Sequence, residues 1–237
     1  MTGAPLLVVE DLYTSYGLSQ VLFGVSLEIA VGECVCLLGR NGVGKTTTMR
    51  SIMGLTPPRQ GRVVWKGRDV SGRPPYQIAD LGIGFVPEDR RIFADLTVWE
   101  NLDVATRSRK GASAWTLERV FDLFPKLREM VDRQGGFLSG GEQQMLTIAR
   151  TLMGNPTGLL LDEPSEGLAP VIVERIGELL RQLRDMGVTV LLAEQNMHFC
   201  LGIASHATII DKGQIVYRDT IEALRSDDAV KSRYLAL

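Results

Sequence analysis

The sequence GRNGVGKT, Gly39–Thr46, decides the fold of this protein. It follows the apolar run ECVCLL and leads into TTTMRSIMGL, which has the pattern of a helix. Glycine at positions 39, 42 and 44 lets backbone N–H groups curl around a phosphate, and the start of a helix adds partial positive charge. Lys45 is predicted to reach the β- and γ-phosphates of a nucleotide, and the Thr46 hydroxyl to ligate Mg²⁺. The stretch therefore predicts a phosphate-binding loop between a buried strand and a helix.

Strand-like and helix-like patterns alternate along the rest of the chain. Short β-like runs between Leu6 and Ile29 predict an N-terminal antiparallel β subdomain. The runs TGLLLDEP, VIVERIGELLRQLRDMG and VTVLLAEQN predict a strand, a helix and a strand, which favours a mainly parallel sheet. Residues 96–152 are predicted to be helical throughout, apart from a polar turn at 108–114, and to form an inserted helical subdomain. We therefore predict a single α/β domain, 1–237, with a P-loop NTPase core.

Composition limits the partners and the compartment. The 237-residue chain has a formal net charge of -2, so no global positive field would attract nucleic acid or an anionic membrane. Its three cysteines are too few for a disulfide framework and are typical of a reducing cytosol. No stretch approaches the roughly 20 apolar residues of a transmembrane helix, and the N-terminus lacks the basic start of a signal peptide. If the protein serves a membrane, another chain is expected to supply the membrane part.

An acidic half of the phosphate site is expected where a buried strand ends. The run LLLDE, Leu159–Glu163, places Asp162 at the tip of such a strand, where a carboxylate can hold a Mg²⁺-bound water. Glu163 is the candidate for orienting and polarising the attacking water. An apolar run that ends in DE is common in itself, but its position after a phosphate loop favours the catalytic interpretation.

A second glycine-rich helix start lies ahead of this acidic pair. In LSGGEQQ, Leu138–Gln144, the residues Ser139, Gly140 and Gly141 precede a helical pattern and would expose N–H donors. A plain capping box with Ser139 and Glu142 explains the same letters and is compatible with an anion seat. LSGGEQQ lies between the phosphate loop and LLLDEP, and in both its letters and this position it resembles the signature of the ABC ATPase family. The resemblance extends over essentially the whole chain.

The resemblance implies ATP and Mg²⁺ as cofactors and a head-to-tail dimer. In the family the signature of one subunit closes over the ATP held by the other, so Ser139, Gly140, Gly141 and Glu142 would act in trans. Tyr16, in TSYG, fits the aromatic residue that stacks on adenine, although an ordinary strand tyrosine is the alternative. LTVWENL, 96–102, resembles the segment that grips a coupling helix of the membrane subunit. The implied ATP contacts are Tyr16, Gly39, Arg40, Asn41, Gly42, Val43, Gly44, Lys45, Thr46 and Thr47.

Three positions depart from the usual family pattern. Glu88 stands where most members have a glutamine, so the Mg²⁺ ligands predicted here are Thr46, Asp162 and Glu88. Gln195 stands where a histidine usually contacts the γ-phosphate; an amide can donate a hydrogen bond there but cannot carry the charge of a protonated histidine. We predict Gln195 to act with Glu163 in catalysis. Ala169 replaces a typical aspartate in the loop after Pro164, which predicts altered communication across the dimer.

The segments PEDRR, EPSEGLAP and LLAEQN together resemble the second, "F"-type, ATPase of branched-chain amino acid uptake systems. That resemblance implies two permease subunits, a second ABC ATPase subunit and, indirectly, a periplasmic substrate-binding protein, with this chain at the cytoplasmic face of the bacterial inner membrane. Urea and short-amide importers look similar. Two further classes stay open at this stage, an ABC ATPase that acts on nucleic acid or the ribosome and a scaffold that binds ATP without efficient turnover. Neither the acidic pI nor the retained Glu163 favours them.

Overall fold

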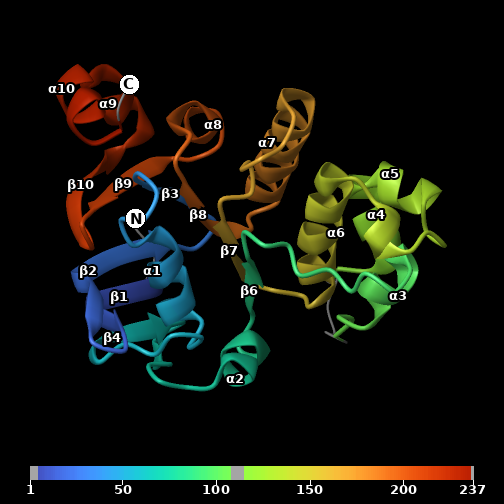
Figure 1. Ribbon diagram of the computed structural model, residues 1–237, viewed down its shortest axis with the longest axis horizontal. Coiled ribbons are helices and arrows are strands. Elements are labelled where there is room, and N and C mark those ends of the chain that lie inside the picture. The colour runs from blue at the N-terminus through green and yellow to red at the C-terminus, as the bar shows by residue number, and fades with distance from the viewer. Residues whose placement is uncertain (1–4, 108–114, 236–237) are drawn as a thin grey trace.

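A six-stranded sheet forms the centre of the computed structural model, which describes residues 5–107 and 115–235 (Figure 1). The strand order is β10-β9-β3-β8-β7-β6, and every neighbouring pair is parallel except the β9–β10 hairpin. The strands are β3 (Cys34–Leu38), β6 (Ile83–Val86), β7 (Gly158–Asp162), β8 (Thr189–Glu194), β9 (His206–Asp211) and β10 (Gln214–Thr220). Strands β3, β7 and β8 are buried throughout, as expected for parallel strands covered on both faces. The sheet confirms the predicted α/β class.

A four-stranded antiparallel sheet covers one face of this central sheet, with α1 (Lys45–Ile52) between the two. In sheet order its strands are β2 (Ser19–Ala30), β1 (Pro5–Tyr16), β4 (Gln60–Trp65) and β5 (Arg68–Asp69). Alternate residues of β1 and β2 join a core cluster with Met49 and Ile52 of α1 and with Leu37 of β3. Helix α2 (Pro75–Asp80) adds Ile78 to the same cluster. The N-terminal antiparallel sheet is present as predicted.

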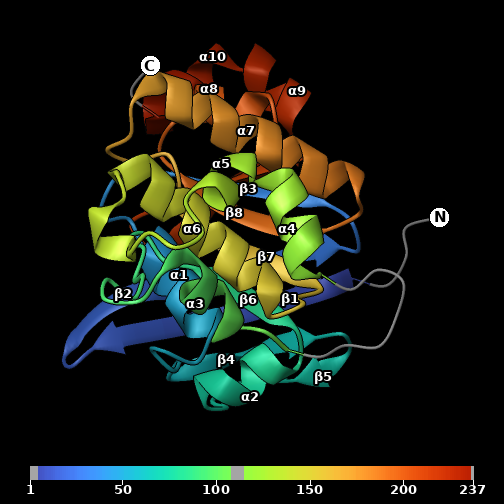
Figure 2. The ribbon, with the colours of Figure 1, turned by 90° about the vertical axis from the view of Figure 1, so that its right-hand side faces the viewer.

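The other helices pack on the opposite face of the central sheet (Figure 2). Helices α6 (Gly140–Met153) and α7 (Pro170–Asp185) bury Ile148, Leu152 and Leu180 in a second core cluster, which also contains Cys34 and Cys36. The remaining elements on this side are α8 (Met197–Leu201), α9 (Ile221–Ser226), α10 (Asp228–Val230) and a π-helical turn, Lys231–Leu235. Helices α1 and α6 thus lie on opposite faces of one sheet.

Between β6 and β7 the chain is helical but interrupted. The elements are α3 (Val98–Asp103), α4 (Leu117–Leu123), α5 (Pro125–Glu129), a short 3₁₀ helix (Gly135–Phe137) and α6. The prediction of helix throughout 96–152 is wrong at 96–97, 104–107 and 115–116, at Phe124, where α4 ends, and at 130–139 apart from the 3₁₀ helix. Pro125 causes the break at Phe124, because proline disfavours helical geometry in the preceding residue and lacks the N–H that would continue the ladder. The polar turn predicted at 108–114 lies outside the described residues.

Candidate nucleotide-binding site

The predicted site residues follow the carboxyl ends of neighbouring parallel strands. Gly39 follows β3, Gln195 follows β8, Glu163 follows β7, and Glu88 comes shortly after β6. Because β3, β8, β7 and β6 are neighbours in the sheet and run in the same direction, these four loops meet at one edge. This edge is where open parallel sheets bind ligands.

The phosphate loop needs glycine at two positions for different reasons. A Cβ on Gly39 would lie 2.5 Å from the carbonyl oxygen of Ile210, so no larger residue fits beside β9. Gly44 has φ 118° and caps the N-terminus of α1, a conformation that side chains disfavour. The carbonyl of Val43 accepts a hydrogen bond from Gly213 N–H at 2.8 Å, which ties the loop to the β9–β10 turn.

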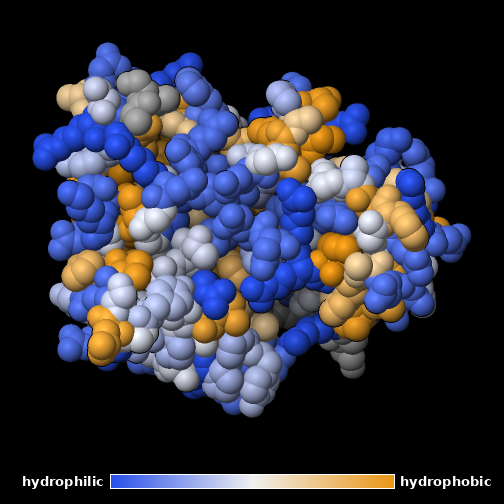
Figure 3. Space-filling model, in the orientation of Figure 1, coloured by the Kyte–Doolittle hydropathy of each residue, from blue (hydrophilic) through white to orange (hydrophobic). Residues whose placement is uncertain are grey.

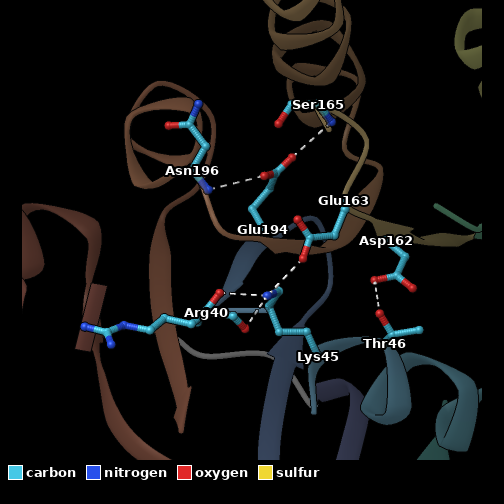
Figure 4. Close-up of polar contacts among 9 residues, drawn as sticks. Arg40, Lys45, Thr46, Asp162, Glu163, Ser165, Glu194 and Asn196 are labelled. Carbon is cyan, nitrogen blue, oxygen red and sulfur yellow. Dashed lines mark hydrogen bonds and ion pairs between the residues drawn. The ribbon is translucent and has the colours of Figure 1, made fainter. Parts of the chain in front are cut away.

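Lys45 is held at the centre of the loop by three oxygens (Figure 4). Its Nζ donates to the carbonyl oxygens of Gly39 and Arg40 at 2.7 and 2.9 Å, and pairs with Glu163 Oε1 at 2.9 Å. The Lys45 and Glu163 side chains are only 3% and 6% exposed, so this ion pair is weakly screened by solvent. Glu163 reaches Lys45 from a left-handed backbone conformation, φ 49°, which is uncommon for a non-glycine residue and is often found at functional sites. The predicted catalytic acid and the phosphate-loop lysine are therefore in direct contact.

Thr46 and Asp162 form a second pair of oxygen ligands. The Thr46 hydroxyl donates to Asp162 Oδ1 at 3.1 Å across the gap between α1 and β7. Burial raises the pKa of the Asp162 carboxyl from 3.8 to about 7, and the Thr46 hydrogen bond opposes part of that rise. Hydroxyl and carboxylate oxygens are ligands that Mg²⁺ prefers. Among the described residues no cluster of three acidic, histidine or cysteine side chains could hold a metal.

Acidic side chains surround a cavity of about 320 Å³ over the phosphate loop. Glu88 lines this cavity together with Glu163 and Glu166. Burial raises the pKa of Glu88, and the neighbouring carboxylates of Glu166 and Glu163 raise it further. Glu166 was not predicted from the sequence, although its position in SEGLAP, three residues after Glu163, is a usable signal. The concentration of negative charge makes a cation beside Lys45 electrostatically favourable.

Tyr16 ends β1 close to the phosphate-loop helix. Its side chain is 46% exposed and lies near the side chains of Thr56 and Thr47. Burial acts to raise the pKa of the Tyr16 hydroxyl, but those polar side chains and the charge of Arg50 outweigh it and lower the pKa. Tyr16 thus presents an exposed ring beside Thr47.

Glu194, the last residue of β8, and Gln195, the first residue after it, differ in burial. Gln195 is exposed and is not among the residues that line the cavity. Glu194 is buried, and burial raises the pKa of its carboxyl from 4.5 to about 7, while hydrogen bonds from Ser165 lower it. The structure therefore brings Lys45, Thr46, Asp162, Glu163 and Glu88 together and leaves Gln195 outside this group.

The signature segment forms the start of α6. Ser139 is its N-cap, and a capping box joins Ser139 N–H to the Glu142 carboxylate at 2.8 Å, which confirms the predicted local structure. A Cβ on Gly140 would lie 2.8 Å from the Arg90 guanidinium, and one on Gly141 would lie 2.8 Å from Ile172 of α7. The helix start is therefore packed between Arg90 and α7. Arg90 was not predicted as a neighbour of the signature.

The Ala169 departure falls on a helix cap. Ala169 is the N-cap of α7 and supplies no side-chain hydrogen bond there, and Pro170 follows at the first helical position. An aspartate at an N-cap would accept a hydrogen bond from the first turn. The substitution thus removes a polar group from the loop that connects Glu163 to α7.

Three features together define an ABC-type ATPase. They are the phosphate loop, the two acidic residues at the end of β7, and a second glycine-rich helix N-terminus, that of α6, on the other face of the sheet. The model of the ABC transporter family matches residues 22–166, and the chain belongs to this family. The high-affinity branched-chain amino acid transport ATP-binding protein BraG of Pseudomonas aeruginosa is 42% identical over 231 residues, 97% of this chain and 99% of BraG. The lipopolysaccharide export system ATP-binding protein LptB of Haemophilus influenzae is 37% identical, with 97% of each chain covered. A solved nucleotide-free ATP-binding cassette from an ABC transporter superposes with a TM-score of 0.82 at 26% identity, covering 96% of this chain and 97% of its own.

Family membership establishes the general activity. The protein binds and hydrolyses ATP as a subunit of a transporter, works with transmembrane permease components and dimerises. Within residues 5–107 and 115–235, no helix combines the length and the apolar character needed to cross a membrane.

Proposed function

We propose that this protein is the ATP-hydrolysing motor subunit of an importer for branched-chain, hydrophobic amino acids. The observation that carries the proposal is the 42% identity to BraG along almost the full length of both chains. ATP binding would close the dimer, hydrolysis would reopen it, and the attached permease would alternate access to its substrate. The resemblance of PEDRR, EPSEGLAP and LLAEQN to the second type of ATPase in such systems supports a heterodimer with a different ATPase.

Within the proposed site each residue has a separate role. Lys45 would bind the β- and γ-phosphates, and Tyr16 would stack on the adenine from its exposed position beside Thr47. Thr46, Asp162 and Glu88 would hold Mg²⁺, which neutralises phosphate charge when bound. Glu163 would orient and polarise the attacking water, since its carboxylate already reaches the lysine that binds the γ-phosphate.

Gln195 would contact the γ-phosphate through its amide. Because the side chain is exposed and lies outside the group around Lys45, this role requires the Gln195 side chain to turn towards the phosphate when the dimer closes. An amide N–H can donate to a phosphate oxygen without adding charge.

The arrangement of α1 and α6 supports a dimer in which each ATP is bound between the two subunits. Helix α1 belongs to the core cluster on one face of the central sheet and α6 to the cluster on the other. The N–H groups at Ser139, Gly140 and Gly141 would therefore serve an ATP held by a second subunit. Head-to-tail pairing gives each ATP the phosphate loop of one subunit and the signature of its partner.

A surface between the central sheet and the helices 98–153 is the proposed permease contact. A cavity of about 410 Å³ lies there, lined by Ile83, Phe85, Val104 and Arg150 among others. Trp99, which is 45% exposed, and Phe93 add large apolar side chains near α3, and Figure 3 shows hydrophobic surface in the region of α3 and α6. Trp99 and Phe93 do not line the cavity itself, but exposed aromatic residues are typical of a protein interface. We therefore propose that residues 96–152 act as the helical subdomain that grips a coupling helix, and that the protein is peripheral at the cytoplasmic face of the bacterial inner membrane.

Purification of the tagged protein from its native membranes in mild detergent tests the proposal. Mass spectrometry is expected to find two hydrophobic permeases, a second ABC ATPase and a periplasmic binding protein. Uptake of radiolabelled leucine, isoleucine and valine by intact cells is expected to fall when the chromosomal copy carries Lys45→Ala. Ribosomal or DNA-associated partners, or unchanged uptake, would refute the assignment.

A lipopolysaccharide-export ATPase is the second candidate, because LptB matches nearly as completely as BraG, at 37% identity. Copurification with an export permease, together with normal amino acid uptake in the Lys45→Ala cells, would favour this candidate. A urea or short-amide importer would copurify with the same kinds of subunits as a branched-chain system. Screening its binding protein against both classes of ligand would distinguish the two.

A further inference from the structure

Glu194 is a buried carboxylate with no role in the proposed binding of ATP and Mg²⁺ or in catalysis. It is the last residue of β8 and is 1% exposed. A buried carboxylate is costly unless both oxygens accept hydrogen bonds. Both oxygens of Glu194 accept from backbone N–H groups, Oε1 from Ser165 at 3.1 Å and Oε2 from Asn196 at 3.4 Å (Figure 4). The carboxylate therefore bridges two loops, each of which begins at a predicted catalytic residue.

The main chain around Glu194 connects to the same region. The Glu194 carbonyl oxygen accepts from the N–H of Gly39, the first glycine of the phosphate loop, at 3.3 Å. The carbonyl oxygen of Ala193 accepts from Glu163 N–H at 2.9 Å. The end of β8 thus contacts the phosphate loop on one side and the loop that starts at Glu163 on the other.

A carboxylate suits this position better than the neutral amide of the same shape. Once ionised, above the pKa of about 7 that burial gives it, its two oxygens can each accept from a different backbone N–H group, and hydrogen bonds to a charged acceptor are the stronger kind. A glutamine would offer one acceptor oxygen, and its NH₂ group would face the other N–H donor. One of the two loops would then lose its anchor while the rest of the core remained intact.

We propose that Glu194 is a positioning residue for ATP hydrolysis, which fixes the loops carrying Glu163 and Gln195 at a set separation around Lys45. Ser165 lies two residues after Glu163 and Asn196 directly follows Gln195, so anchoring these two N–H groups limits the movement of both predicted catalytic side chains. The inference rests on the proposed roles of Glu163 and Gln195. Small errors in the placement of reacting groups are costly for rate while leaving ground-state binding largely intact.

Steady-state ATPase assays on the full chain with Glu194→Gln test this inference. The kcat is expected to fall about tenfold or more, with the KM for ATP unchanged within about twofold, because the loop residues that bind ATP stay in place. Hydrogen-exchange mass spectrometry is expected to show faster exchange in peptides containing Ser165 and Asn196, and unchanged exchange in α1. Glu194→Asp keeps both acceptor oxygens but withdraws them by one methylene group, so its kcat is expected to lie between those of wild type and Glu194→Gln. It also keeps the test available if the glutamine variant does not fold.

Glu33→Gln is the matched control. Glu33 is a partly buried carboxylate that accepts a backbone N–H, that of Ala30 at 2.8 Å, but it lies at the end of β3 opposite the phosphate loop. This variant is expected to keep wild-type kcat. An unchanged kcat in Glu194→Gln, a parallel loss of kcat and ATP affinity, or an equal loss in Glu33→Gln overturns the inference. Glu163→Gln, assayed in the same way, distinguishes failure of the proposed site roles from failure of the positioning role. Full activity of Glu163→Gln refutes the site roles. An inactive Glu163→Gln together with a fully active Glu194→Gln refutes only the positioning role of Glu194.

Discussion

Replacing Asp162 with asparagine is expected to stabilise the metal-free protein at neutral and alkaline pH. Burial raises the pKa of Asp162 in the folded state to about 7, against an ordinary value of 3.8. Between these values the folded protein keeps a proton that the unfolded chain releases. The contribution of Asp162 to the free energy of unfolding is therefore most favourable below about pH 4, and it is lost as the pH rises towards 7. Asparagine keeps a carbonyl acceptor for the Thr46 hydroxyl and never becomes charged.

The magnitude follows from the separation of the two pKa values. About three pH units at 1.36 kcal/mol each give roughly 4 kcal/mol as the largest cost of the ionised, buried side chain. About two of those units lie between pH 5 and 7. The stability advantage of Asp162→Asn over wild type should therefore grow by about 3 kcal/mol between pH 5 and pH 8. Glu194, whose pKa burial also raises to about 7, is present in both proteins and does not affect the difference.

Urea unfolding followed by circular dichroism, with EDTA and without nucleotide, measures this difference at pH 5, 6, 7 and 8. Asp132→Asn, a change at an exposed carboxylate, is the control and should show no pH-dependent gap. If wild type and Asp162→Asn lose stability in parallel as pH rises, Asp162 does not carry the buried charge and the reasoning fails. The same variant should lose ATP hydrolysis, because the carboxylate that is costly to bury is the proposed Mg²⁺ ligand.

Three further substitutions test the proposed site. Glu163→Gln should retain ATP binding, measured with a fluorescent analogue, and lose about 100-fold or more in phosphate release, since it removes the group that polarises water; undiminished turnover would contradict its role. Ser139→Arg should leave nucleotide binding by the monomer intact but abolish ATP-dependent dimerisation in sedimentation velocity, and persistence of the dimer would exclude the trans arrangement. Gln195→His should change kcat several-fold, because histidine can bring charge to the γ-phosphate. A rate identical to wild type would mean that position 195 does not reach the phosphate.

The local parts of the site could be predicted because the residues themselves determine them. Gly39 and Gly44 are required by a close backbone approach and a positive φ, and the capping box of Ser139 and Glu142 needs only its own helix turn. The alternation of apolar runs with helical patterns likewise sufficed for the parallel sheet. The break at Phe124 is also a local effect, caused by Pro125, but the helical spacing of the apolar residues on both sides of the proline masks it in the sequence.

Contacts that depend on the order of strands in space could not be predicted from the sequence. Glu163 meets Lys45 because β7 and β3 flank β8, and nothing in LLLDE or GRNGVGKT specifies that neighbourhood. The separation of α1 and α6 onto opposite faces is also a tertiary property. The role of Glu194 could not be predicted either, because a carboxylate that binds two backbone N–H groups has no sequence signature of its own.

The order β3-β8-β7 explains why two of the departures from the family pattern, Gln195 and Ala169, have to be considered together. Strand β8 lies between the strand of the phosphate loop and the strand of the acidic pair, so a shift of the loop after β8 reaches both neighbours. The Glu194 carboxylate gives that loop an anchor on the segment leading to Ala169, where α7 starts without a side-chain cap. In the loop between β7 and α7, Ser165 is hydrogen-bonded to Glu194, whereas Ala169 makes no side-chain cap. We therefore expect the backbone to be less mobile near Glu163 than near the start of α7. In this arrangement the exposed side chain of Gln195 can turn towards the phosphate, while the anchored backbone of its loop and the contact between Glu163 and Lys45 keep their geometry.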